Sequence, residues 1–196
     1  RRASAPVEAA GKERAQRLVD LYGRTHCGKW LWFEDSLTYC NARMPQALIA
    51  TGSWLGDDEM LQIGLRSLAW LARVQSTEDG VFAPVGSNGF HLRDGAKAIF
   101  DQQPVEACGM VAACLEAHRV TGEREWLSRS RQAFNWFLGQ NQLQEPLLDP
   151  STGGCRDGLH ADRPNQNQGA ESTLSFLMAL HDMRQSERSL GVLTPR

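Results

Sequence analysis

The sequence contains no apolar run that approaches the roughly 20 residues needed to span a bilayer. It also lacks a C-x-x-C pair, and its five cysteines are widely spaced, which favours free thiols in a reducing compartment over disulfides or zinc. The formal net charge is −2, which does not favour nucleic acid or an anionic membrane as a partner. We therefore expect a cytoplasmic protein with no metal ion and no nucleic-acid or membrane partner.

Signatures of nucleotide binding and of several catalytic classes are missing too. The chain has no G-x-G-x-x-G, no Walker A motif, no G-x-S-x-G and no H-E-x-x-H. We expect no cofactor, and any glycosyltransferase activity would need a nucleotide-sugar domain outside this chain. Strand-like alternation is absent over any useful length, which leaves helices as the main elements.

Helical periodicity is what the sequence does contain. The expected helices cover residues 6–23, 36–54, 57–75, 104–121, 123–141 and 169–183 of a single domain, 1–196, with a tail at 184–196. Pro45 lies inside the second helix and must either kink it or mark a later start. Pro104 suits the first turn of the fourth.

The chain also repeats itself. Five residues recur 66 positions later: Asp35, Gly56, Glu59, Leu61 and Trp70 return as Asp101, Gly122, Glu125, Leu127 and Trp136. A fainter match sets residues 103–107 against 168–172, at an offset of 65. The repeating unit is therefore a helical hairpin plus a long loop, longer than the ~34 to ~47 residues of common helical solenoid repeats.

The two helices of one unit differ in character. Residues 107–115 are apolar all round and residues 174–180 nearly so, which is typical of helices buried on every side. The helices at 57–75 and 123–141 have only an apolar stripe. We predict an all-α fold, an (α/α) hairpin toroid with about three inner–outer helix pairs.

Loop lengths indicate which end of the helices carries the function. Connections within a hairpin are short, whereas residues 77–103 and 142–168 form long loops rich in polar and aromatic side chains. Both lead into the N-terminus of an inner helix, where free N–H groups favour anions and hydrogen-bond acceptors. A polar, aromatic-lined bowl at this end is the expected site.

Three segments, 37–48, 101–107 and 157–173, resemble the six-hairpin (α/α)6 glycosidases and the helical carbohydrate-active domains of bacterial glycosyltransferase proteins. The resemblance implies a glycoside-hydrolase-like domain that acts on or binds a sugar or oligosaccharide. The alternative is a non-catalytic sugar-binding or scaffold module that accompanies a glycosyltransferase. A full toroid of this kind needs about twice this length, so we also expect self-association or a missing N-terminal half.

The catalytic candidates are carboxylates at this end. Glu106 and Glu171 lie in the first turns of inner helices, where they could be a general acid and base, with Asp101 close enough to raise the pKa of Glu106. Both glutamates could equally brace the loops by capping. Asp35 and Asp101 match in the repeat, which fits a shared cap as well as a catalytic role.

The substrate-binding candidates are aromatic, charged and amide side chains of the same end: Trp30, Trp32, Asp35, Arg43, His91, Asp157, Asn165, Asn167 and Gln168. The tryptophans could form a sugar platform or simply pack. Asp157 could be a turn residue, and Arg43 could pair with Glu106 or Asp101. The amides could bind sugar hydroxyls or cap the last helix.

Overall fold

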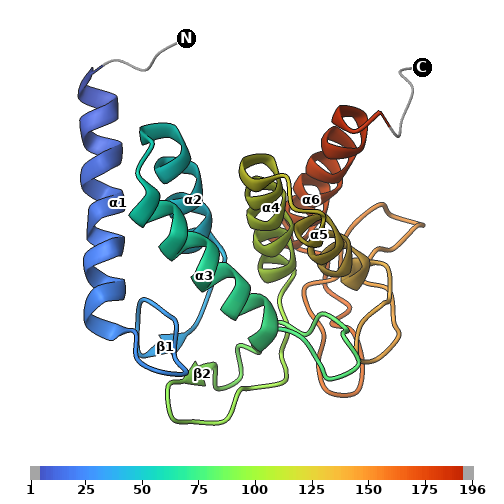
Figure 1. The fold of residues 1–196 in the computed structure, drawn as a ribbon. Helices are drawn as coiled ribbons and strands as arrows, with labels where there is room; N and C mark the ends of the chain where they lie inside the picture. The colour runs from blue at the N-terminus through green and yellow to red at the C-terminus, as the bar shows by residue number, and fades with distance from the viewer. Residues whose placement is uncertain (1–4, 192–196) are drawn as a thin grey trace.

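The computed structural model describes residues 5–191 (Figure 1). Its elements are, in chain order, α1 (Ala5–Thr25), β1 (Ser36–Leu37), α2 (Arg43–Leu55), α3 (Asp58–Val74), β2 (His91–Leu92), α4 (Pro104–Thr121), α5 (Arg124–Phe137) and α6 (Ala170–Ser189). The predicted all-α class is confirmed. No helix in the described part is both long and apolar enough to cross a membrane.

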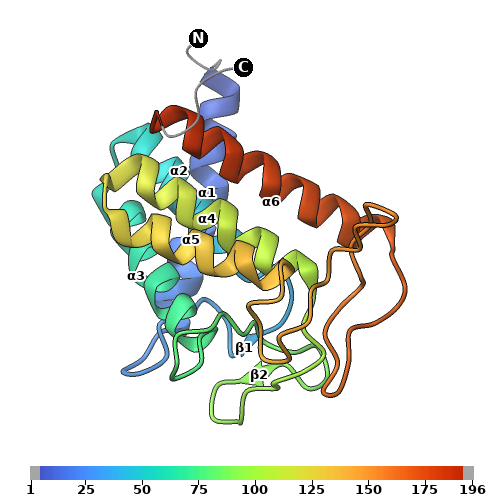
Figure 2. The same cartoon turned by 90° about the vertical axis from the view of Figure 1, so that its right-hand side faces the viewer.

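The helices form an arc of hairpins. α2 and α3 form one hairpin, α4 and α5 the next, and α4 packs against both α2 and α6. The predicted inner helices α2, α4 and α6 therefore lie side by side, while α3 and α5 cover their outer side (Figure 1). Figure 2 shows α6 at one edge of the arc, with α4 and α5 beside it. This is the toroid arrangement that the repeat predicts.

Both hairpins turn in the same way, as their repeat requires. Gly56 after α2 and Gly122 after α4 have φ values of 69° and 74°, the left-handed conformation that glycine adopts at little cost. Asp57 then caps α3, since its side chain accepts a hydrogen bond from the amide of Met60 at 3.0 Å. The short connections thus lie at one end of the helices.

The first hairpin is unusually close at two glycines. A Cβ added to Gly64 would lie 2.8 Å from Cγ1 of Ile49, and one added to Gly52 would lie 2.6 Å from the amide nitrogen of Leu61. The backbones of α2 and α3 therefore approach where only glycine fits.

The predicted start of the second helix is wrong. α2 begins at Arg43 rather than at Ser36, because Pro45 has no N–H to donate and is tolerated in a first turn but not inside a helix. Residues 36–37 instead pair antiparallel with residues 91–92, so β1 and β2 form a small two-stranded sheet that the sequence did not predict.

Two further helix ends differ from prediction. α5 ends at Phe137 rather than near Asn141, whose side-chain amide donates to the carbonyls of Trp136 and Glu145 and so fixes a loop instead. α6 runs on to Ser189 rather than stopping at Met183. The predicted tail therefore begins later, and residues 192–196 lie outside the described part of the chain.

Both long loops, together with β1 and β2, lie at the same end of the helices (Figures 1 and 2). This end is opposite the short hairpin turns, as the sequence predicts. We call it the loop end.

Candidate functional site

The two glutamates proposed as a pair are not equivalent in the structure. Glu106 is the third residue of α4, whereas Glu171 is the second residue of α6. One residue corresponds to about 100° around a helix, so the two side chains point in different directions. Glu106 is 2% exposed, like Ser172 at 5%, the third residue of α6, while Glu171 is exposed. The expected symmetry of the acid–base pair is therefore wrong.

Glu106 joins three helices. Its carboxylate accepts hydrogen bonds from the side-chain amide of Asn41 at 2.9 Å, from the backbone amide of Asn41 at 3.4 Å and from the side chain of Gln75 at 3.2 Å. Burial raises the pKa of the Glu106 carboxyl, and these amide donors partly oppose the rise. A side chain with almost no surface cannot touch a substrate, so this geometry favours the bracing interpretation.

Glu171 is bonded across the inner side of the arc instead. It accepts a hydrogen bond from the hydroxyl of Tyr39, which lies just before α2 and is 45% exposed. Burial raises the pKa of the Tyr39 hydroxyl, and the bond to Glu171 adds to the rise. Sequence reasoning gave Tyr39 no role. The signal was available, because Tyr39, Val105 and Glu171 are 66 residues apart and so share one place in the repeat.

The repeat-matched aspartates each hold the long loop that follows. Asp35 is ion-paired with Arg93 at 2.9 Å, and Asp101 bonds to the ring of His160 at 2.5 Å. The side chain of Asp101 is 34% exposed and that of Asp35 is 82% exposed. Shared position in the repeat thus corresponds to a shared task, that of fixing a loop.

The two tryptophans proposed as a sugar platform are core residues. Trp30 is 6% exposed and Trp32 fully buried, so the packing alternative holds for both. Their rings pack around Trp70, at centroid distances of 5.0 Å and 5.8 Å. His91 is half-buried with its ring against Trp30, and burial lowers its pKa.

Arg43 does not pair as the sequence suggested. It is exposed, and its guanidinium donates to the side chain of Gln46 at 2.8 Å rather than to Glu106 or Asp101. Its charge nevertheless reaches both neighbouring helices, since it lowers the pKa of Cys40 and of Asp182 against the opposing effect of burial. Arg43 is therefore available on the inner side of the arc.

The segment before α6 is mainly occupied with its own loop. Asp157 accepts from the backbone amide of Gly169, the residue that precedes α6, at 2.6 Å. Gln168 donates to Asp149 at 2.9 Å. Asn165 accepts from the backbone of Asn167 at 3.0 Å, which leaves the exposed side chain of Asn167 facing solvent.

His91 and His160 are not part of a metal site in the described residues, where no three His, Cys, Asp or Glu side chains come together in a way that could hold an ion.

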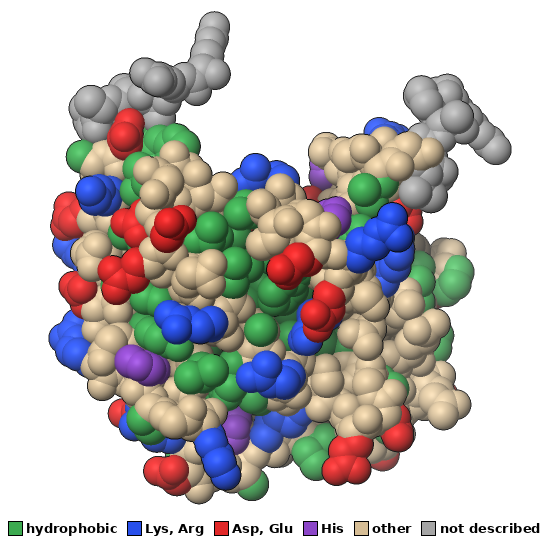
Figure 3. All heavy atoms as spheres, viewed as in Figure 1, with side chains coloured by type: hydrophobic (Ala, Val, Ile, Leu, Met, Phe, Trp, Pro, Cys, Tyr) green, Lys and Arg blue, Asp and Glu red, His purple; other side chains and the backbone are tan. Residues whose placement is uncertain are grey.

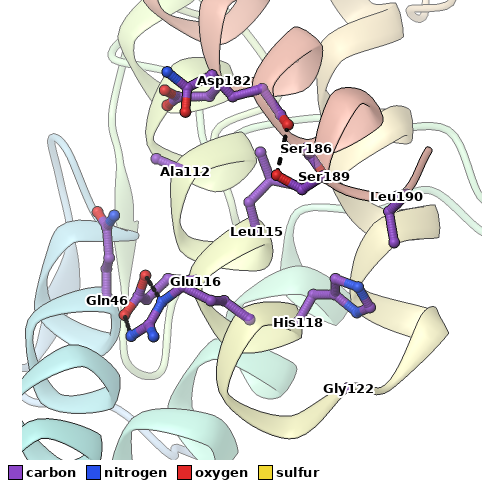
Figure 4. A pocket seen from close by; sticks show the side chains of 12 residues that line it. Gln46, Ala112, Leu115, Glu116, His118, Gly122, Asp182, Ser186, Ser189 and Leu190 are labelled. Carbon is purple, nitrogen blue, oxygen red and sulfur yellow. Dashed lines mark hydrogen bonds and ion pairs between the residues drawn. The ribbon is translucent and has the colours of Figure 1, made fainter. Parts of the chain in front are cut away.

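A cavity lies on the inner side of the arc, towards the C-terminal ends of the inner helices (Figure 4). Its volume is about 590 Å³. The lining residues come from α2, α4 and α6 and from the ends of the last two: Gln46, Ala112, Leu115, Glu116, His118, Arg119, Gly122, Asp182, Gln185, Ser186, Ser189 and Leu190. Sequence reasoning missed this cavity, although Glu116 and Asp182 are 66 residues apart and so match in the repeat.

Comparison with known proteins gives a fold rather than a family. No protein-family model matches the chain, and no curated protein matches its sequence. Among solved structures, the GH76A alpha-1,6-mannanase from Salegentibacter sp. HEL1_6 has a similar fold, with a TM-score of 0.54 at 14% identity. The match covers 95% of this chain but only 60% of that one. The chain thus has the helical toroid fold of a glycoside hydrolase and spans well under two thirds of that enzyme's length.

Proposed function

We propose that this chain is a glycoside-hydrolase-like, carbohydrate-active domain that holds a sugar at its loop end, against Tyr39 and Glu171. The observation that carries the proposal is the bond between these two side chains. An exposed aromatic ring offers a surface to the C–H face of a sugar, and a carboxylate beside it accepts hydrogen bonds from hydroxyls.

The surrounding carboxylates favour binding over hydrolysis. Hydrolysis of a glycosidic bond generally needs two carboxyl groups that both reach the sugar. Glu106 is buried, while Asp35, Asp101 and Asp157 are each engaged in fixing a loop. Glu171 remains the one accessible carboxylate of the original candidates. We therefore place the non-catalytic sugar-binding module, associated with a glycosyltransferase, ahead of the hydrolase.

Calorimetric titration with oligosaccharides tests the proposal. Alpha-1,6-linked mannose oligosaccharides come first, because the similar structure is named as a mannanase acting on that linkage. Tyr39→Ala and Glu171→Gln should each weaken binding on the order of 10-fold, which corresponds to about 1.4 kcal/mol. Trp54→Ala is the matched aromatic control, since Trp54 is 47% exposed but belongs to the opposite end of α2.

Three results would decide between the alternatives. Equal loss in Tyr39→Ala and Trp54→Ala would move the sugar site away from the loop end. Absence of binding to every neutral oligosaccharide in a broad panel would end the proposal. Release of shorter sugars, abolished in Glu171→Gln on the order of 10²-fold, would reinstate the hydrolase.

A further inference from the structure

The cavity and the Tyr39–Glu171 bond share one side of the inner helices. On α6, Asp182 and Ser189 follow Glu171 by 11 and 18 residues, which are close to whole numbers of turns of 3.6 residues. Both line the cavity, so Glu171 lies on the same helix face as the cavity wall. We call this surface, from Tyr39 and Glu171 to the cavity, the inner groove.

Arg43 connects the two ends of the inner groove along α2. It bonds to Gln46, which lines the cavity, and its charge acts on Asp182 of the facing wall. It acts equally on Cys40, the residue next to Tyr39. The groove is therefore one continuous surface between α2 and α6, with α4 as its floor.

The length of the inner groove limits what can occupy it. Eleven residues separate Glu171 from Asp182, and a rise of 1.5 Å per residue places them roughly 16 Å apart along α6. A single sugar bound at Tyr39 cannot reach the cavity. A ligand that contacts both ends must be an extended chain.

The cavity lining matches the chemistry of a neutral, polyhydroxylated chain. It combines amide, hydroxyl and carboxylate groups with the apolar side chains of Ala112, Leu115 and Leu190 (Figure 4). Its charges balance: Glu116 is paired with Arg119 at 2.6 Å, and Asp182 faces Arg43. A balanced lining gives no advantage to a charged ligand.

We propose that the ligand is a neutral oligosaccharide chain that lies along the inner groove, with one end at Tyr39 and Glu171 and the other in the cavity beside Asp182. This rests on the proposed function, and it adds that the site selects for chain length. Affinity then increases from a disaccharide to a longer member of the same series, because only the longer chain reaches the cavity.

A length series separates this proposal from the previous one. Asp182→Ala should weaken binding of the longer oligosaccharide on the order of 10-fold and leave the disaccharide unchanged, whereas Tyr39→Ala should weaken both. Glu187→Ala is the matched control, since this acidic residue is on the same helix but does not line the cavity. Gln185→Ala is a second cavity variant at an exposed position, should Asp182→Ala fail to fold.

The outcomes are distinguishable. If the wild-type chain binds both lengths equally, or if Asp182→Ala and Gln185→Ala leave the longer ligand unaffected, the inner groove is not a sugar site and the loop-end site stands alone. If no oligosaccharide binds the wild-type chain, both proposals fail together.

Discussion

The side-chain amide of Asn41 donates to the carboxylate of Glu106 over 2.9 Å and across 65 residues of chain. This bond joins the start of one inner helix to the first turn of the next. The side chain of Gln75 adds a third helix to the same carboxylate. A buried acceptor shared in this way makes the junction of two hairpins sensitive to one polar side chain.

Asn41→Ala should destabilise the fold by about 1–3 kcal/mol at neutral pH, because it leaves a buried carboxylate short of donors. The penalty should depend on pH. The pKa of Glu106 is raised above its ordinary value of 4.5, so the folded state keeps a proton that the unfolded state has lost. Stability therefore falls as pH rises from 4.5 towards the folded-state pKa, and losing the Asn41 donors extends that interval.

Urea unfolding of both proteins across this pH range measures the effect. Asn41 also accepts a bond from the backbone of Thr38, at 3.0 Å, so part of the penalty is independent of pH. In a Glu106→Gln background only that constant part should remain. A penalty that is the same at every pH, with or without Glu106, would contradict the assignment.

The phenol absorbance of this protein should change little near pH 10. Its two tyrosines, Tyr22 and Tyr39, both have a pKa raised above 10.0, mainly by burial. Because the protonated phenols are favoured in the folded state, stability is lost as pH rises above 10. Glu171→Gln should move one of the two transitions partway down. Alkaline spectrophotometric titration measures this, and two normal transitions at pH 10 would show that neither hydroxyl is constrained.

Gly64→Ala should cost about 1–3 kcal/mol, because the added methyl would meet Ile49 and the carbonyl of Pro45 at 2.8–3.0 Å. Gly23→Ala is the matched control in α1, where nothing lies within 4 Å of the new Cβ. It should stabilise the protein by about 0.5–1 kcal/mol, the helical preference of alanine over glycine. Thermal unfolding compares them, and equal effects would mean that the two hairpin backbones can separate freely.

The outer flank of α6 should cause self-association. Leu174, Leu177 and Met178 follow a helical spacing and are 57%, 47% and 52% exposed. Their counterparts 66 residues earlier include Cys108 and Val111, which are 3% and 0% exposed in α4, the helix that α6 packs against. A helix face that is covered in one repeat and open in the next tends to find a partner.

Light scattering over a concentration series tests this flank. Leu177→Gln should reduce association without loss of stability, whereas Leu92→Gln should change neither, since Leu92 is 61% exposed on β2 and isolated. A wild-type protein that stays monomeric at every concentration would refute the expectation.

Helix existence was predictable here because periodicity and capping signals are local. Gly56 and Gly122 mark their turns by chemistry alone, and Pro45 limits where α2 can begin. The start of α2 was misplaced because residues 36–37 are held by pairing with residues 91–92, a contact across a long loop that no local pattern reveals.

The candidate site was harder to predict, since it depends on rotation about the helix axis. Glu106 and Glu171 look alike in the sequence, yet a shift of one position within the first turn buries the former and exposes the latter. Trp32 was proposed as a surface residue and is in the core, because residue type alone does not distinguish a stacking platform from a packed ring.

The position of α4 in the arc determines how the molecule should open. α4 packs against α2, α3, α5 and α6, whereas α1 and α6 lie at the two edges with neighbours on one side only. In such a row of hairpins, local unfolding begins where neighbours are missing and spreads inward. Amide protons of α4 should therefore exchange with solvent only during global unfolding, while those at both edges exchange through smaller and more frequent openings.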